Sequence, residues 1–347
     1  MQNFSGFQVG VNLGGWISQY GRYDPEHFRR FILEEDIQRI ASWGMDHVRL
    51  PVDYPVLEDD ERPFVYKESG FAYIDSCIEW CRKAGLNLVL DLHHAPGFSF
   101  STLDRNTLFD DPAAQERFLA LWEAIARRYA GVEKPELILE LMNEVVLPTS
   151  DPWNRLAHRA VERIRAVDPH RWIMIGGNWY NSAWKLKEIT RVDDPHIVYT
   201  FHFYEPMPFT HQRAPWVDFL KAYGRVTEFP GDLPGLEEFL QSHPQYQEAF
   251  AAYRGKRMDE AMLRYFLQPA VDFLNETHLP LYCGEYGAID HAPLESRLNW
   301  HRAFCDLLNR HGIGRAVWSY KEMNFALVRL DGSLVSEELV RIVSSRG

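Results

Sequence analysis

The chain has 347 residues, and 46% of them are apolar, which is enough to bury a large core and too many for a disordered protein. Its 37 basic and 49 acidic side chains give a formal net charge of −12, and the sequence contains no block of Lys or Arg. This balance argues against electrostatic binding of nucleic acid or of an anionic membrane surface, and it favours a neutral or cationic ligand.

Short apolar runs alternate with longer amphipathic segments along almost the whole chain, which is typical of repeated βα units. The predicted strands are Phe7–Asn12, Asp46–Pro51, Leu86–His93, Leu137–Asn143, Trp172–Gly176, His196–Phe203, Leu279–Glu285 and Gly314–Trp318. The main predicted helices are Glu35–Trp43, Tyr73–Ala84, Pro112–Tyr129, Pro152–Val167, Leu294–Arg310 and Ser336–Ser344. Since no Gly-rich phosphate loop follows the first strand, we predict an α/β fold in which residues 1–347 form one (β/α)₈ TIM barrel domain.

One interval is far longer than an ordinary βα connection. Residues 205–268 separate the sixth and seventh predicted strands, and a segment of this length requires structure of its own. Leu236–Gln241 and Tyr246–Tyr253 have helical patterns, which predicts a small helical subdomain at the carboxyl end of the barrel. Aromatic residues make up 14% of the chain and are frequent in this interval, so we favour a wall of a ligand cleft over a passive cap.

The amino terminus has neither the basic stretch nor the apolar run of a secretory signal, and no run approaches the about 18 apolar residues that span a membrane. The four cysteines, Cys77, Cys81, Cys283 and Cys305, show no paired metal-binding spacing. Cys77 and Cys81 are four residues apart in a predicted helix and are expected to be free thiols. These features fit a reducing compartment, so we expect a cytoplasmic protein or one exported without a recognisable signal.

Polar side chains end strand after strand, although strand interiors of a packed barrel are apolar. The residues at these ends are Asn12, Arg49, Asp91, His93, His94, Asn143, Glu144, Asn178, His202, Tyr204, Glu285 and Trp318. Each buried polar group costs stability, and so many of them are unexpected unless they have a function. The active sites of barrel enzymes lie at the carboxyl ends of the strands, so the sequence predicts an active site there.

Two carboxylates follow strands that are otherwise dominated by apolar residues. Glu144 comes after the fourth predicted strand and Glu285 closes the seventh, so the two can face each other across the barrel mouth. Cleavage of a glycosidic bond uses such a pair, in which one carboxyl group donates a proton and the other attacks or activates water. Their environments must therefore separate their pKa values.

A divalent metal site is the competing interpretation of this rim. Its ligands would come from His93, His94, Glu144, His202 and Glu285, which are suitable residue types for such a site. We rank it below the two-carboxylate interpretation, because no His-x-His pair ends the first strand and the aromatic residues would have no role.

Six motifs in order resemble those of glycoside hydrolase family 5, and together they cover nearly the whole predicted barrel. They are Val48-Arg-Leu-Pro51, Asp91-Leu-His-His94, Leu141-Met-Asn-Glu144, Phe201-His-Phe-Tyr204, Gly284-Glu-Tyr-Gly287 and Ala316-Val-Trp318. The opening Val11-Asn-Leu-Gly-Gly-Trp-Ile17 and the long interval after the sixth strand resemble a compact bacterial endoglucanase subgroup with a helical insertion.

This resemblance implies a retaining mechanism without a cofactor or metal, with Glu144 as acid/base, Glu285 as nucleophile and carboxyl groups about 5 to 5.5 Å apart. The supporting active-site residues that it implies are Arg49, His93, Asn143, His202, Tyr204 and Trp318, with Trp318 as a sugar platform. If His93 enters the barrel mouth, His94 is expected to pack sideways or to support it, because neighbouring side chains of a strand point to opposite faces. Weaker candidates for the flanking sugar subsites are Asn12, Trp16, Trp179, Tyr180 and Trp216.

The expected substrates are β-1,4 or mixed-linkage β-1,3-1,4 glucans, as soluble polymers or oligosaccharides. A β-mannanase, an exo-β-1,3-glucanase and a catalytically inactive carbohydrate-binding barrel remain as alternatives, because members of one fold differ in loops and subsites. We expect a monomer that has no nucleic-acid or membrane partner.

Overall fold

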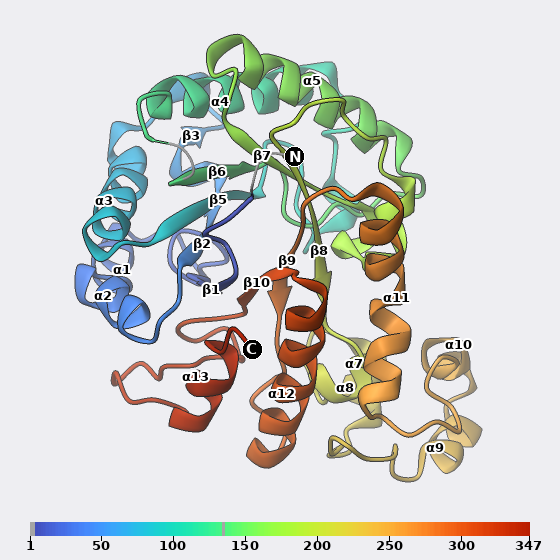
Figure 1. The fold of residues 1–347 in the computed structure, drawn as a ribbon. Helices are drawn as coiled ribbons and strands as arrows, with labels where there is room; N and C mark the ends of the chain where they lie inside the picture. Colours follow the sequence, from blue (N-terminus) through green and yellow to red (C-terminus); the bar gives the residue numbers. More distant parts are fainter. Residues whose placement is uncertain (1–3, 134–135) are drawn as a thin grey trace.

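Residues 4–133 and 136–347 are described by the computed structural model of the protein. Eight parallel strands close into a barrel in the order β1-β10-β9-β8-β7-β6-β5-β2, so the predicted (β/α)₈ barrel is confirmed (Figure 1). These strands are β1 (Val9–Asn12), β2 (His47–Asp53), β5 (Asn87–His94), β6 (Leu137–Glu140), β7 (Trp172–Gly176), β8 (Ile197–Phe203), β9 (Leu281–Tyr286) and β10 (Gly314–Val317). Val11 of β1 pairs with Val317 of β10 and with Val48 of β2, which closes the ring.

Helices surround the barrel and cover the outer faces of its strands (Figure 1). The longer ones are α2 (Glu34–Ser42), α3 (Glu68–Ala84), α4 (Pro112–Tyr129), α5 (Asp151–Val167), α11 (Glu260–Thr277), α12 (Leu294–His311) and α13 (Glu337–Val343). Local signals explain their ends: the side chain of Asp111 accepts a hydrogen bond from the Ala113 N–H at the start of α4, and Pro112 occupies the first helical position. Gly85 ends α3 in the left-handed conformation at φ 71°.

The predicted boundaries of β7 and α4 agree with the structure, whereas two strands near the candidate site differ. β6 ends at Glu140, because the chain leaves the sheet there, so Asn143 and Glu144 lie in the following loop. Glu285 lies inside β9 instead of closing it. The sequence analysis also missed helix α1 (Pro25–Arg30) and the hairpin of β3 (Glu58–Asp59) and β4 (Arg62–Tyr66).

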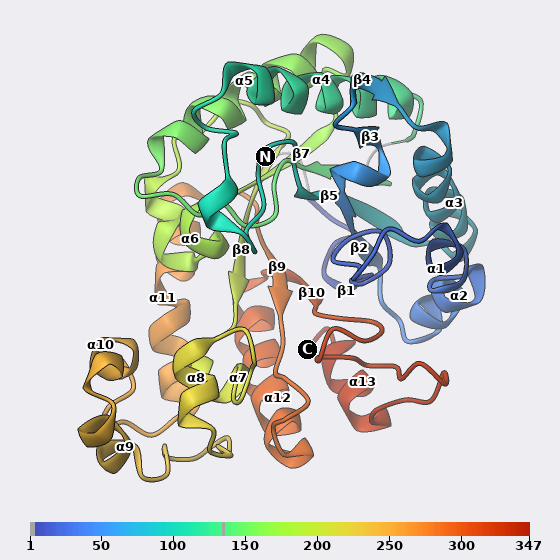
Figure 2. The same cartoon turned by 180° about the vertical axis from the view of Figure 1, so that it is seen from behind.

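Between β8 and α11 the chain forms a group of short helices, which lie together beside α11 and away from α1, α2 and α3 in both views (Figures 1 and 2). They are α7 (Met207–Thr210), α8 (Asp218–Tyr223), α9 (Leu236–Ser242) and α10 (Gln247–Phe250). The predicted helices at Leu236–Gln241 and Tyr246–Tyr253 correspond to α9 and to the region of α10. Residues 260–268 belong to the long helix α11.

Part of the aromatic content of this segment forms its own core. The rings of Tyr223, Phe239 and Phe250 contact one another with centroids 5.2 to 6.0 Å apart, and all three side chains are buried. The Tyr253 hydroxyl donates a hydrogen bond of 2.6 Å to Glu205, which follows the end of β8 by two residues. The segment is therefore attached to the rim of the barrel where β8 ends.

All four cysteines are free and buried, as expected for Cys77 and Cys81 on α3. Among the helices in the described ranges, none has the length and apolar character needed to cross a membrane.

Candidate active site

Arg49 of β2 lies at the centre of the candidate site and is fully buried. Its Nε and Nη2 donate to the two oxygens of Glu140 at 2.7 and 3.0 Å, which is a bidentate contact. Its Nη1 donates to Glu285 at 2.8 Å and to the side-chain oxygen of Asn12 at 2.9 Å. Its Nη2 also donates to the side-chain oxygen of Asn143 at 2.9 Å. The guanidinium of Arg49 thus contacts four residues, which lie on β1, β6 and β9 and in the loop after β6.

Glu140 is the residue of this network that the sequence analysis missed. It is fully buried in β6, and burial raises its pKa to about 7 against the opposing charge of Arg49. Asp91 of β5 also contacts Arg49, at 3.1 Å, and burial raises its pKa to about 7 in the same way. The sequence contains a sign of this role, since Glu140 is the one charged residue of its predicted strand and a buried carboxylate needs a compensating partner.

Both carboxylate oxygens of Glu285 accept hydrogen bonds from fixed donors. Oε1 accepts from Arg49 at 2.8 Å, and Oε2 accepts from the Tyr204 hydroxyl at 2.9 Å. Burial raises the pKa of Glu285, while the charge of Arg49 and the hydrogen bond from Tyr204 act in the opposite direction. Arg49 and Tyr204 thus offset part of the effect of burial, so the pKa of Glu285 is raised less than burial alone would raise it.

Glu144 has a different environment, although it lies close to Glu285. Its Oε1 lies 2.8 Å from Nδ1 of His202, and the same nitrogen lies 3.7 Å from Oε2 of Glu285. Burial and the negative charge of Glu285 raise the pKa of Glu144 well above its ordinary value. Of the two carboxyl groups, Glu144 is therefore the one that retains a proton.

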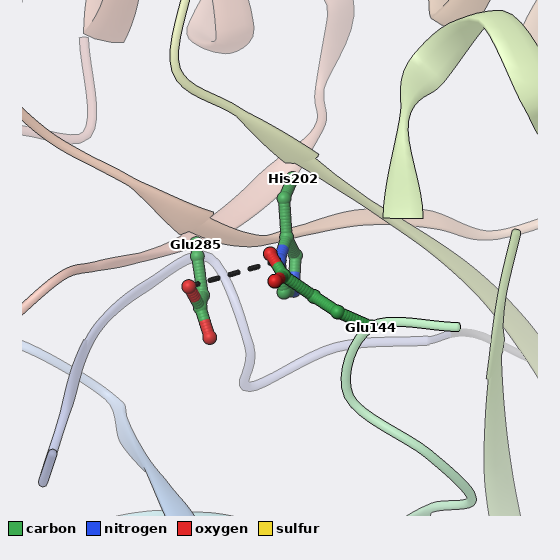
Figure 3. Close-up of side chains that lie close together, drawn as sticks. All are labelled: Glu144, His202 and Glu285. Carbon is green, nitrogen blue, oxygen red and sulfur yellow. Dashed lines mark hydrogen bonds and ion pairs between the residues drawn. The ribbon is translucent and has the colours of Figure 1, made fainter. Parts of the chain in front are cut away.

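Glu144, His202 and Glu285 converge from the loop after β6, from β8 and from β9 (Figure 3). A ligand atom of each lies within 4.8 Å of a ligand atom of both others, so these three residues could also hold a metal ion. The other two candidate metal ligands pair with different carboxylates. His93 Nδ1 lies 2.6 Å from Asp91, and His94 Nδ1 lies 3.1 Å from Asp53.

His93 and His94 pair with different carboxylates, although their ring centroids lie only 5.9 Å apart and the pairing of β5 with β2 is irregular at this point. The ring of His93 is buried and lies parallel to Trp318, with centroids 5.7 Å apart. Burial lowers the pKa of His93 to about 3, so its imidazole is neutral. The rings of His93 and His94 lie 5.2 and 4.8 Å from the ring of Phe100, a residue of the loop after β5 that the sequence analysis did not identify.

The weaker candidates separate into buried and exposed residues. Trp16 is 1% exposed, stacks on Trp80 and donates its indole N–H to the Phe28 carbonyl at 2.6 Å, so the structure contradicts the expectation of a sugar subsite there. The reason is that α3 and α1 cover the β1 loop, which makes this tryptophan part of the core. Asn12 is also fully buried and holds Arg49.

Three aromatic candidates are exposed. Their side chains have exposed fractions of 56% for Trp179, 41% for Tyr180 and 53% for Trp216. Trp179 and Tyr180 follow β7 in the left-handed conformation, each at φ 56°, and the Tyr180 N–H donates to the Val145 carbonyl at 3.1 Å. Val145 follows Glu144 directly, so this exposed pair is anchored beside that carboxyl group.

An eight-stranded parallel barrel with two carboxyl groups facing each other at its carboxyl-terminal mouth is an arrangement that glycoside hydrolases use. The model of the family "Cellulase (glycosyl hydrolase family 5)" matches residues 5–324, and the chain belongs to this family of glycoside hydrolases.

Known relatives match over nearly the full length of the chain. Endoglucanase C of Acetivibrio thermocellus is 47% identical over 340 residues, covering 98% of both chains. Cellodextrinase A of Ruminococcus flavefaciens is 36% identical over 312 residues, covering 89% of this chain and 84% of its own. A solved structure of Thermotoga maritima Cel5A in complex with cellobiose superimposes with a TM-score of 0.78 over 97% of each chain at 24% identity, and it shows the same fold.

Proposed function

We propose that this family 5 enzyme is a retaining endo-β-glucanase that cleaves β-1,4 and mixed-linkage β-1,3-1,4 glucans, with Glu144 as acid/base and Glu285 as nucleophile. The observation that carries the proposal is the opposed environment of two adjacent carboxyl groups. Glu285 accepts hydrogen bonds on both oxygens, whereas the pKa of Glu144 is raised by burial and by the charge of Glu285. Two relatives with the names endoglucanase and cellodextrinase support the substrate class.

The reaction proceeds by two displacements at the anomeric carbon. In the first, Glu285 forms an ester with that carbon while Glu144 gives its proton to the departing glycosidic oxygen, which leaves as a hydroxyl group. In the second, ionised Glu144 takes a proton from water, whose oxygen attacks the anomeric carbon and displaces Glu285 as a carboxylate. Arg49 and Tyr204 favour the ionised form of Glu285 and orient its carboxylate in the free enzyme.

Retention of the anomeric configuration tests this mechanism directly. Cellotetraose and barley β-glucan are incubated with enzyme, and proton NMR follows the newly formed reducing ends. We expect the β anomer to appear first and the α anomer to follow by mutarotation, and we expect lower rates on mannan and on β-1,3-glucan.

Initial release of the α anomer would overturn the retaining mechanism. Absence of hydrolysis on every glycan would instead indicate a carbohydrate-binding barrel. Loss of activity after chelation and recovery with added metal would favour the alternative in which Glu144, His202 and Glu285 hold an ion.

We further propose that the exposed aromatic residues bind the sugar chain on either side of the cleavage point. Trp179 and Tyr180 lie on the side of Glu144, where the leaving group departs. Burial, and after it the nearness of Glu144, raises the pKa of Tyr180. Trp216 belongs to the segment at residues 205–268, which we propose as a wall of the cleft.

The Trp179→Ala variant is expected to raise KM for cellohexaose about tenfold, because stacking of a sugar on an aromatic ring contributes on the order of 1 kcal/mol. The cleavage of an aryl cellobioside, which places no glucose unit on the leaving-group side, should change little. Trp184→Ala is the matched control, since Trp184 is also exposed but contacts Tyr265 on the outer helix α11. Equal effects of the two variants would argue against a subsite at Trp179.

A further inference from the structure

Two buried polar atoms beside the candidate catalytic pair have no hydrogen-bond partner among the described residues. They are Oγ1 of Thr200 and Nε2 of His202, which belong to side chains that are 0% and 6% exposed. Both residues lie on β8 two positions apart, so their side chains point to the same face of the strand.

Both atoms face the same point, which is the space left by the missing side chain of Gly284. A Cβ at this glycine would lie 3.0 Å from Oγ1 of Thr200 and 3.2 Å from Nε2 of His202. Since each of the two atoms lies within 3.2 Å of this one point, a single water molecule can reach both of them. Gly284 immediately precedes Glu285, so the two atoms lie close to the backbone that carries the candidate nucleophile.

The state of His202 Nε2 determines what the other ring nitrogen can do for Glu144. Burial and the positive charge of Arg49 lower the pKa of His202 well below its ordinary value, so the ring is neutral and carries a single N–H. With the hydrogen on Nδ1, the ring donates to Oε1 of Glu144, and the carboxyl proton is left on Oε2. With the hydrogen on Nε2, the unprotonated Nδ1 accepts the carboxyl proton and withholds it from a leaving group.

We propose that Thr200 is a positioning residue for the acid/base carboxyl group. Its hydroxyl donates to Nε2 of His202, directly or through one water molecule beside Gly284, and thereby keeps the imidazole hydrogen on Nδ1. The acid proton of Glu144 then stays on Oε2, where a glycosidic oxygen can receive it. This role rests on the proposed function of Glu144.

The test compares Thr200→Val, which keeps the shape of the side chain and removes the hydroxyl, with Thr200→Ser, which keeps the hydroxyl. For cellotetraose, whose leaving group needs a proton, we expect kcat/KM of Thr200→Val to fall about tenfold, the effect of one lost hydrogen bond. For 2,4-dinitrophenyl β-cellobioside, whose leaving group departs as a stable anion, kcat/KM should stay within about twofold. Thr200→Ser should behave like the parent enzyme on both substrates.

Equal losses of Thr200→Val on both substrates, or no loss on cellotetraose, would overturn the role of Thr200. Glu144→Gln, measured in parallel, separates this failure from failure of the proposed function. If Glu144→Gln loses far more activity on cellotetraose than on the dinitrophenyl substrate and Thr200→Val does not, only the inference about Thr200 fails. If Glu144→Gln retains its activity on cellotetraose, the acid/base assignment itself fails.

Nitrogen-15 NMR of histidine-labelled enzyme provides a readout that is independent of turnover. The ring signals of His202 are assigned by comparison with His202→Asn. We expect the hydrogen on Nδ1 in the parent enzyme and in Thr200→Ser, and a shift of population toward Nε2 in Thr200→Val. An unchanged ring state in Thr200→Val would contradict the proposal.

Discussion

Glu285→Ala is expected to lower kcat on β-glucan by about 10⁵-fold, on the scale of other deletions of a catalytic nucleophile. The physical reason is that no other described group lies between the Arg49 and Tyr204 donors where an ester could form. The variant also leaves space for a small anion. Added azide should therefore restore cleavage of 2,4-dinitrophenyl β-cellobioside and yield the α-cellobiosyl azide, because azide then attacks from the side on which Glu285 was.

The measurement is release of dinitrophenolate with and without azide, followed by NMR of the sugar product. Glu237→Ala serves as control, since Glu237 is an exposed carboxylate that pairs with Arg254 on the surface of the segment after β8. Its activity should match that of the parent enzyme. A β-cellobiosyl azide from Glu285→Ala would show that this residue is not the nucleophile.

Glu144→Gln is expected to lower kcat/KM for cello-oligosaccharides by about 10³-fold, within the range that general acid catalysis contributes. The loss should be much smaller for 2,4-dinitrophenyl β-cellobioside, whose leaving group needs no proton. The pH profile should change as well. Because the pKa of Glu144 is raised, the group is protonated and active below that pKa, and parent activity is lost as pH rises through it.

The Gln variant has no proton to lose at this position, so its residual activity should lack that decline on the alkaline side. Profiles of kcat/KM against pH for the two proteins, on the same substrate, check this expectation. The same alkaline decline in Glu144→Gln and in the parent enzyme would assign the titration to another group and remove the acid role from Glu144.

A buried ionic network around Arg49 holds Glu285 in place. Arg49 contacts Asp91, Glu140 and Glu285, and each of the four side chains is at least nine-tenths buried. Removing the guanidinium would leave buried carboxylates without compensation, which is strongly unfavourable. The network therefore places Glu285 through contacts that do not depend on the ligand.

Much of the fold and of the site was predictable from local patterns. The apolar run Trp172–Gly176 and the segment Pro112–Tyr129, which follows the capping Asp111, have the boundaries that their periodicity and capping residues predict. A polar residue at the end of a buried strand costs stability unless it has a partner or a function. This argument identified Arg49, His202 and Glu285. Their convergence follows from the barrel, since parallel strands bring all their carboxyl ends to one rim.

Other features depend on contacts that no local pattern contains. A tryptophan is a residue type that can stack on a sugar, but Trp16 packs against Trp80 and is part of the core. Glu140 follows Arg49 by 91 residues, and only the register of β6, β5 and β2 brings the two side chains together. The same holds for Thr200 and His202, which face Gly284 of the neighbouring strand β9.

The sequence by itself determined the alternation of strands and helices, and with it the barrel and the set of polar residues at its mouth. The physical reason is that side-chain periodicity and the cost of burying a polar group can be recognised within one short segment of the chain. The tertiary structure decided which of these residues touch, which carboxyl group retains a proton and which aromatic rings remain exposed. These properties depend on strand register and on burial, which arise only when distant segments pack together.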